Sequence, residues 1–79
     1  MSQVLGLIAG NGRFPFLVAQ AARRAGRQVV AVAIREEASP ELAQEVDEIH
    51  WVGLGQLGRC LEALKASGAS EAVMAGQVK

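Results

Sequence analysis

The chain has 79 residues, 51% of them hydrophobic, and its eight basic residues balance its eight acidic ones. This length allows one small domain, and the hydrophobic content excludes a disordered charged tail. Because the formal net charge is zero, no overall field attracts nucleic acid, so any anion-binding site must be local. No apolar run reaches the roughly 18 residues of a membrane span, the start lacks a signal peptide, and a single cysteine fits a reducing compartment. We therefore expect a cytoplasmic protein.

The first half of the chain alternates strand and helix patterns. The apolar run at residues 4–9 and the β-branched run at residues 28–34 predict two buried strands of a parallel sheet. Pro15 suits the first turn of an intervening helix, and Gly26 is placed to end that helix in a left-handed conformation. Apolar residues recur between them at helical spacing: Phe14, Leu17, Val18, Ala21, Ala22 and Ala25.

The second half continues this alternation. Ser39 is a candidate N-cap, followed by Pro40 at the first position of a short helix within residues 39–46. The remaining predicted elements are a strand at residues 48–52, an amphipathic helix that begins at Leu57 and is ended by Gly68, and a strand at residues 71–75. The order predicts a Rossmann-like α/β fold, an open parallel sheet of about four strands with flanking helices. Because doubly wound sheets usually have five or six strands, we expect residues 1–79 to be part of a larger doubly wound domain.

Three glycine-bearing turns follow predicted strand ends. They are Gly10-Asn11-Gly12 after the first strand, the GLGQLG run at residues 53–58 after the third, and Gly76-Gln77 after the fourth. Ligands of open parallel sheets bind beyond the carboxyl ends of the strands, and parallel strands share that rim. We therefore expect the three turns to converge on one binding site.

The first turn has the composition of an anion-binding loop. Gly10 and Gly12 can adopt positive φ and let a ligand approach the backbone, Asn11 can donate from its side chain, and Arg13 adds a charge. A dinucleotide fingerprint would need a third glycine where Pro15 stands, so NAD fits poorly. The turn predicts either contact with a phosphate or sugar nucleotide, or a tight strand-to-helix turn that needs glycine for φ alone.

The second turn formally matches G-x-G-x-x-G, but it follows the third strand and no acidic residue stands about 20 positions further on at a strand end. It is either a loop that faces ligand or a turn with purely geometric glycines. Arg35 and Glu36 follow the second strand, where Arg35 would suit a phosphate, although such a charged run is more typical of a solvated loop.

Few other residues suggest chemistry. His50 is interpreted as a packed or hydrogen-bonded residue, Trp51 as a core or interface anchor, Cys60 as a small hydrophobe and Met74 as strand core. No histidine has a carboxylate partner at a telling spacing. We therefore expect no catalytic residue and no metal ligand in this chain.

Three segments together resemble a known family. These segments are GLIAGNGRFP near the start, WVGLGQLGRCLEAL in the middle and VMAGQVK at the end. Together they resemble the N-terminal domain of the UDP-2,3-diacylglucosamine pyrophosphatases of lipid A biosynthesis in Gram-negative bacteria. This family was formerly classified as a domain of unknown function. The resemblance covers all 79 residues, and Phe14 stands where a leucine is more usual.

The resemblance implies a two-domain enzyme, with a Rossmann-like first domain and a second domain, outside this sequence, that carries the catalytic aspartate and magnesium. Such enzymes hydrolyse UDP-2,3-diacylglucosamine to 2,3-diacylglucosamine 1-phosphate and UMP. The ligand-binding residues expected in this chain, from the resemblance and from rim position, are Gly10, Asn11, Gly12, Arg13, Gly55, Gln56, Gly58, Gly76 and Lys79.

The predicted function is therefore that of the substrate-positioning half of a magnesium-dependent hydrolase, inactive as a 79-residue piece. The expected partners are the glycolipid nucleotide, a transient contact with the inner-membrane surface and further copies of the chain, but not nucleic acid. Two alternatives stay open: a non-catalytic Rossmann module for nucleotides or sugar phosphates, and a structural docking domain.

Overall fold

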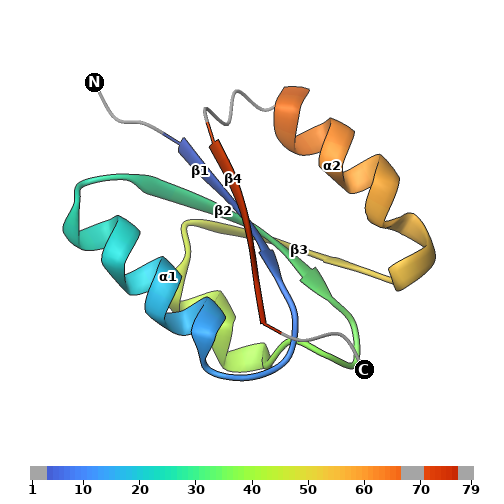
Figure 1. Ribbon diagram of the computed structural model, residues 1–79, viewed down its shortest axis with the longest axis horizontal. Coiled ribbons are helices and arrows are strands. Elements are labelled where there is room, and N and C mark those ends of the chain that lie inside the picture. Colours follow the sequence, from blue (N-terminus) through green and yellow to red (C-terminus); the bar gives the residue numbers. More distant parts are fainter. Residues whose placement is uncertain (1–3, 67–70, 77–79) are drawn as a thin grey trace.

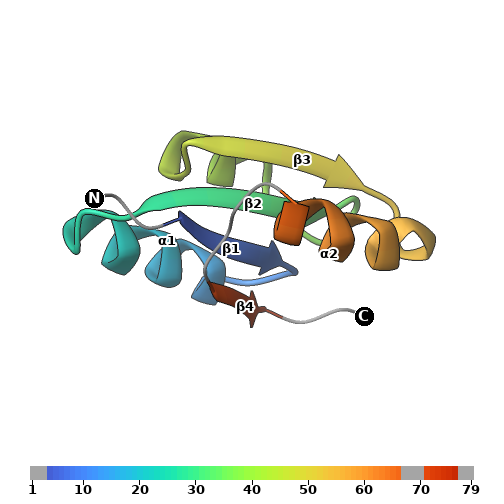
Figure 2. The same ribbon diagram turned by 90° about the horizontal axis from the view of Figure 1, so that it is seen from above.

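A computed structural model describes residues 4–66 and 71–76 of the chain. Its elements, in chain order, are β1 (Val4–Ala9), α1 (Phe14–Arg24), β2 (Gln28–Ile34), the 3₁₀ helix η1 (Pro40–Glu45), β3 (Glu48–Val52), the 3₁₀ turn η2 (Leu54–Gln56), α2 (Leu57–Ala66) and β4 (Glu71–Ala75) (Figure 1). The strands form one sheet in the order β3-β2-β1-β4, and every pair is parallel (Figure 2). The Rossmann-like fold class and all four predicted strands are confirmed.

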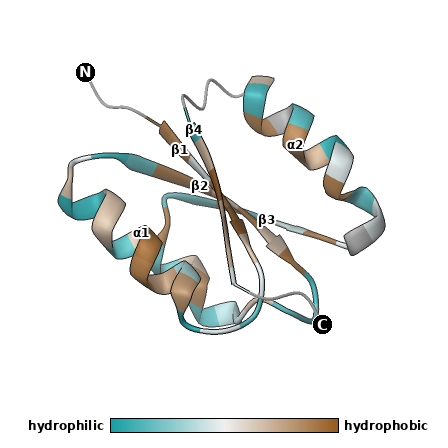
Figure 3. Ribbon diagram, viewed as in Figure 1, coloured by the Kyte–Doolittle hydropathy of each residue, from teal (hydrophilic) through white to brown (hydrophobic). Residues whose placement is uncertain are grey.

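The central strands are buried because helices cover both faces of the sheet. On one face, α1 and η1 pack against alternate residues of β1 and β2, and Leu7, Val29 and Leu42 are fully buried there. On the other face, α2 contributes Leu64 to a smaller cluster with Ile8 and Val32. Hydrophobic residues accordingly concentrate along the middle of the sheet (Figure 3). Continuous apolar strands are what burial on both faces requires.

One glycine in the sheet sets how closely α2 can approach. A Cβ at Gly6 of β1 would lie 3.3 Å from the Leu64 side chain. The missing side chain thus leaves room for the Leu64 side chain on the sheet.

Only some of the apolar residues that recur along α1 are buried. The buried residues of the helix are Pro15, Ala19 and Ala22, whereas Phe14 and Leu17 are 57% and 52% exposed. The apolar residues of α1 surround more than one side of the helix, and Phe16 and Val18 are partly buried against the same cluster. The small alanines allow close packing on the sheet.

Met74 was expected in the core, but its side chain is 64% exposed. It lies on the α2 side of β4, the edge strand of the sheet, and α2 instead packs against β2. The sequence pattern of β4 is apolar, yet the pattern alone does not say which face a neighbouring helix covers.

The predicted end of α1 and the predicted start of the short helix agree with the structure. Ser39 accepts a hydrogen bond from the Glu41 backbone N–H at 3.3 Å and begins η1, and Gly26 has φ of 78° where α1 ends. The short helix is a 3₁₀ helix. Gly68, expected to end the second long helix, lies outside the described residues.

Candidate functional site

The carboxyl ends of the four parallel strands form one rim of the sheet, but the three glycine turns are not equally close. The turns after β1 and β4 are neighbours because these strands pair directly. The turn after β3 lies at the opposite edge of the sheet, separated from β1 by β2. The rim therefore has a β1/β4 side, which contains residues 10–13 and 76, and a β3 side, which contains residues 35, 36 and 51–58.

The first turn leads into α1, whose N-terminus has neither a side-chain cap nor an acidic residue. Gly12 has φ of 100° and Arg13 is the N-cap, whose side chain makes no capping hydrogen bond. No acidic residue stands in the first turn of α1, and Arg13 is exposed. The N-terminus of a helix carries a partial positive charge and attracts anions. The described residues thus leave this helix end without a negative side chain of its own.

Gly10, unlike Gly12, does not have positive φ. Its N–H donates to the carbonyl of Ala75 at 2.9 Å, so the residue prolongs the pairing of β1 with β4. Asn11 is half-buried next to it. Among the first-turn residues only Gly12 needs glycine for its backbone conformation.

Gly76 touches the first turn. It has φ of 94°, and a Cβ there would lie 2.6 Å from the Asn11 carbonyl oxygen and 2.9 Å from the Gly10 carbonyl carbon. Real Cβ atoms do not come this close to backbone atoms. Gly76 is therefore required by packing between two adjacent turns. Gln77, the second residue of this predicted turn, and Lys79, a predicted ligand contact, lie outside the described residues.

The second turn is held by its own side chain. Gly53 donates its N–H to Gln56 Oε1 at 3.2 Å, and the Gln56 N–H donates to the Gly53 carbonyl at 3.0 Å. The bond to the Gln56 side chain corresponds to one half of a capping box, and the second bond joins backbone groups. Gln56, a predicted ligand contact, thus has a structural role here.

Gly55 and Gly58 differ from the other rim glycines. Neither has positive φ, and a Cβ on either would meet no atom of the described part of the chain within 4 Å. Gly58 is the second residue of α2, and glycine is less favourable than alanine by up to about 1 kcal/mol in a helix. Residues 53–58 were interpreted either as a loop that faces ligand or as a turn that needs glycine for its geometry. The second interpretation does not explain Gly55 and Gly58.

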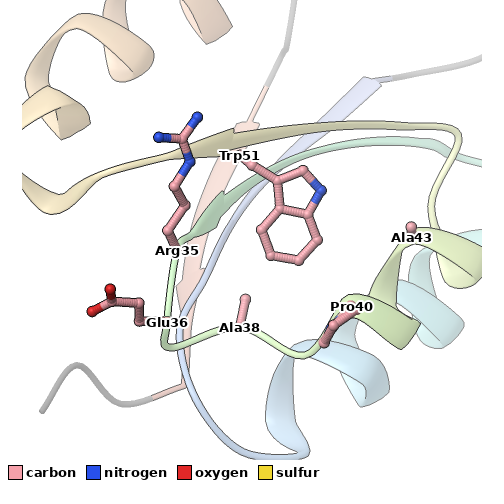
Figure 4. A pocket seen from close by; sticks show the side chains of 6 residues that line it. All are labelled: Arg35, Glu36, Ala38, Pro40, Ala43 and Trp51. Carbon is pink, nitrogen blue, oxygen red and sulfur yellow. The ribbon is translucent and has the colours of Figure 1, made fainter.

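A pocket that the sequence did not predict lies on the β3 side of the rim. It has a volume of about 670 Å³ and is lined by Arg35, Glu36, Ala38, Pro40, Ala43 and Trp51. Figure 4 shows the indole of Trp51 extending from β3 toward the segment of Ala38 and Pro40, with Arg35 and Glu36 at the end of β2. The residues of the pocket are separated by up to 16 positions in sequence, and nothing in a one-dimensional pattern brings them together.

Glu36 has φ of 72°, in the left-handed region that non-glycine residues rarely adopt. The residue follows β2 at the edge of this pocket. Backbone conformations of this kind are enriched at ligand-binding sites. The sequence signals for this region were the charged run after the second predicted strand and Trp51, interpreted as a core or interface anchor.

The remaining candidates have no catalytic arrangement. His50 is exposed and hydrogen-bonded to the Glu48 carboxylate. This partner, two residues away in sequence, was not predicted. The two alternate residues share one side of β3, which the alternation of a strand requires. Cys60 is half-buried against the α2-side cluster, as expected.

Within residues 4–66 and 71–76, no group of three or more histidine, cysteine or acidic side chains could hold a metal ion. In the same part of the chain, no helix is both long and apolar enough to span a membrane.

The fold and the rim define an open, parallel α/β domain of the Rossmann-like class, whose loops beyond the strand ends are suited to bind a ligand. The sequence model of one family, the LpxI N-terminal domain, matches residues 4–79, and the chain belongs to this family. It is 36% identical over 74 residues to the UDP-2,3-diacylglucosamine pyrophosphatase LpxI of Caulobacter vibrioides. That match covers 94% of this chain and 26% of the relative, so the chain spans about a quarter of the relative's length. The family resemblance stated from the three segments is confirmed.

Proposed function

We propose that this chain is the substrate-positioning N-terminal part of a hydrolase that cleaves the pyrophosphate of UDP-2,3-diacylglucosamine. The observation that carries the proposal is the family match over residues 4–79, together with a relative whose name states this activity. The products of this hydrolysis are 2,3-diacylglucosamine 1-phosphate and UMP. One water molecule is consumed, and one phosphorus–oxygen bond of the diphosphate is broken.

The bare N-terminus of α1 supports a role in holding the diphosphate. Backbone N–H groups near Gly12 and the guanidinium of Arg13 can hold charged oxygens without giving up a proton. In this role the chain binds and orients the substrate, and the reacting groups belong to another part of the enzyme.

Magnesium would supply charge stabilisation at the diphosphate, and we place its ligands in a second domain, as the family resemblance implies. We also propose that the working enzyme is cytoplasmic, associates with further copies of itself and meets its acylated substrate at the inner-membrane surface.

Two measurements test the proposal. The purified 79-residue chain should release no UMP from UDP-2,3-diacylglucosamine in the presence of magnesium. Measurable release would contradict the proposal that the reacting groups belong to another part of the enzyme. Calorimetry should show that UMP and glucosamine 1-phosphate bind more tightly than NAD. Tighter binding of NAD would favour a general nucleotide-binding module, and no binding of any of the three would favour a docking domain.

A further inference from the structure

The pocket beside Trp51 has the properties of a site for a flat ring. Its volume of about 670 Å³ is within the range of roughly 300–1,000 Å³ that is typical of small-molecule sites. Trp51 is half-buried and presents an aromatic face, and the opposite wall consists of small or rigid side chains, namely Ala38, Pro40 and Ala43. Apolar walls with an indole are suited to stack a nucleobase, because every base has a π-face.

The polar groups of the pocket lie at one end. Arg35 offers only donors and Glu36 only acceptors, and both side chains are exposed at the end of β2. A uracil ring displays two carbonyl acceptors on either side of one N–H donor. The two residues thus carry both the donors and the acceptors that such an edge requires, although Figure 4 shows the Glu36 carboxylate pointing away from the indole.

The position of the pocket relative to the first turn suits a nucleotide. Trp51 lies on β3 and packs against the cluster on the α1 side of the sheet, the side on which the N-terminus of α1 follows β1. Two strand spacings separate β1 from β3, which is about 10 Å. A ribose with its phosphates can extend over this distance, so one ligand can reach both the helix end and the indole.

The geometry points to the Trp51 pocket as the site for the uracil ring of a uridine nucleotide, with its phosphates directed toward Gly12 and Arg13. This assignment rests on the proposed function for the identity of the base. It adds a base-binding site on the β3 side of the rim to the anion-binding turn on the β1/β4 side.

The experiment uses the fluorescence of Trp51, the only tryptophan of the sequence. The chain is titrated with UMP, with ribose 5-phosphate and with inorganic phosphate, and calorimetry is run in parallel. UMP should change the Trp51 emission in a saturable manner, whereas the two ligands without a base should not. Equal emission changes with ribose 5-phosphate would overturn the assignment.

A variant that fills the pocket provides the second test. Ala43 is exposed and lines the pocket, so Ala43→Leu should narrow it without removing a core contact and should weaken UMP binding about tenfold. Gln44→Leu adds the same side chain at an exposed neighbour that does not line the pocket, and it should bind UMP like the unchanged chain. Thermal melts establish that both variants are folded.

The outcomes separate this inference from the proposed function. If UMP binds in calorimetry but Trp51 emission is unchanged and Ala43→Leu binds normally, the base pocket is wrong and the proposed function stands. If UMP does not bind at all, both are overturned.

Discussion

The two sides of the rim use glycine for different reasons. On the β1/β4 side, Gly76 has positive φ and no space for a Cβ, and Gly12 has positive φ with open space around it. On the β3 side, Gly55 and Gly58 have neither positive φ nor a close neighbour. The fold thus requires the first pair and does not require the second. A glycine that the fold does not require is the better candidate for a contact with something outside the chain.

The largest expected effect is that of Gly76→Ala. The new Cβ would overlap backbone atoms of Gly10 and Asn11 at a residue that already has positive φ, so we expect the free energy of unfolding to fall by about 3 kcal/mol. Urea unfolding measures this. Gly55→Ala is the matched control on the β3 side, and equal losses in the two variants would remove the distinction between the sides.

Gly12→Ala should cost less, about 1 kcal/mol, because only the backbone conformation opposes the substitution. If the first turn holds the phosphates, the affinity for UMP should fall as well. Gly26→Ala is the control, since Gly26 also has positive φ and open space but lies before β2, away from the rim. A loss of affinity in both variants, or in neither, would contradict a specific role for Gly12.

Gly58→Ala should act in the opposite direction and raise the free energy of unfolding by about 0.5–1 kcal/mol, because alanine is the better helix former and meets no neighbour. If Gly58 contacts ligand, the more stable variant should bind UMP more weakly. Thermal melts and calorimetry on the same samples decide this. A gain in stability with unchanged affinity would leave the GLGQLG run without a role in binding UMP.

The smallest effect is expected for Gln56→Ala, which removes the acceptor for the Gly53 N–H. An exposed hydrogen bond of this type contributes about 0.5 kcal/mol. Gln56→Glu keeps an acceptor oxygen and should restore the stability in urea unfolding. If instead Gln56→Ala leaves the stability unchanged and lowers only UMP affinity, the side chain acts on ligand rather than on the turn.

The sequence predicted the sheet well because burial on both faces leaves a strong signal. Residues 4–9 and 28–34 are continuous apolar runs bounded by turn residues, and the structure has strands at these positions. Pro15, Gly26 and Ser39 likewise act locally, through backbone conformation or a neighbouring N–H, so their roles could be inferred without tertiary information.

The sequence predicted poorly what depends on contacts between distant segments. The exposure of Met74 depends on where α2 crosses the sheet, and the requirement for Gly76 depends on the Asn11 carbonyl 65 positions earlier. The Trp51 pocket combines the end of β2, η1 and β3. A pattern of residue types records the period of each element but not the distances between elements.

The edge of β4 has a practical consequence. Among the described residues β4 pairs with β1 alone, so its other side offers unpaired peptide groups next to the exposed thioether of Met74. Such an edge is a template for intermolecular strand addition. Purified samples of this chain should therefore be kept at low protein concentration. Met74→Lys would place a charge on this edge strand and oppose fibril growth during storage.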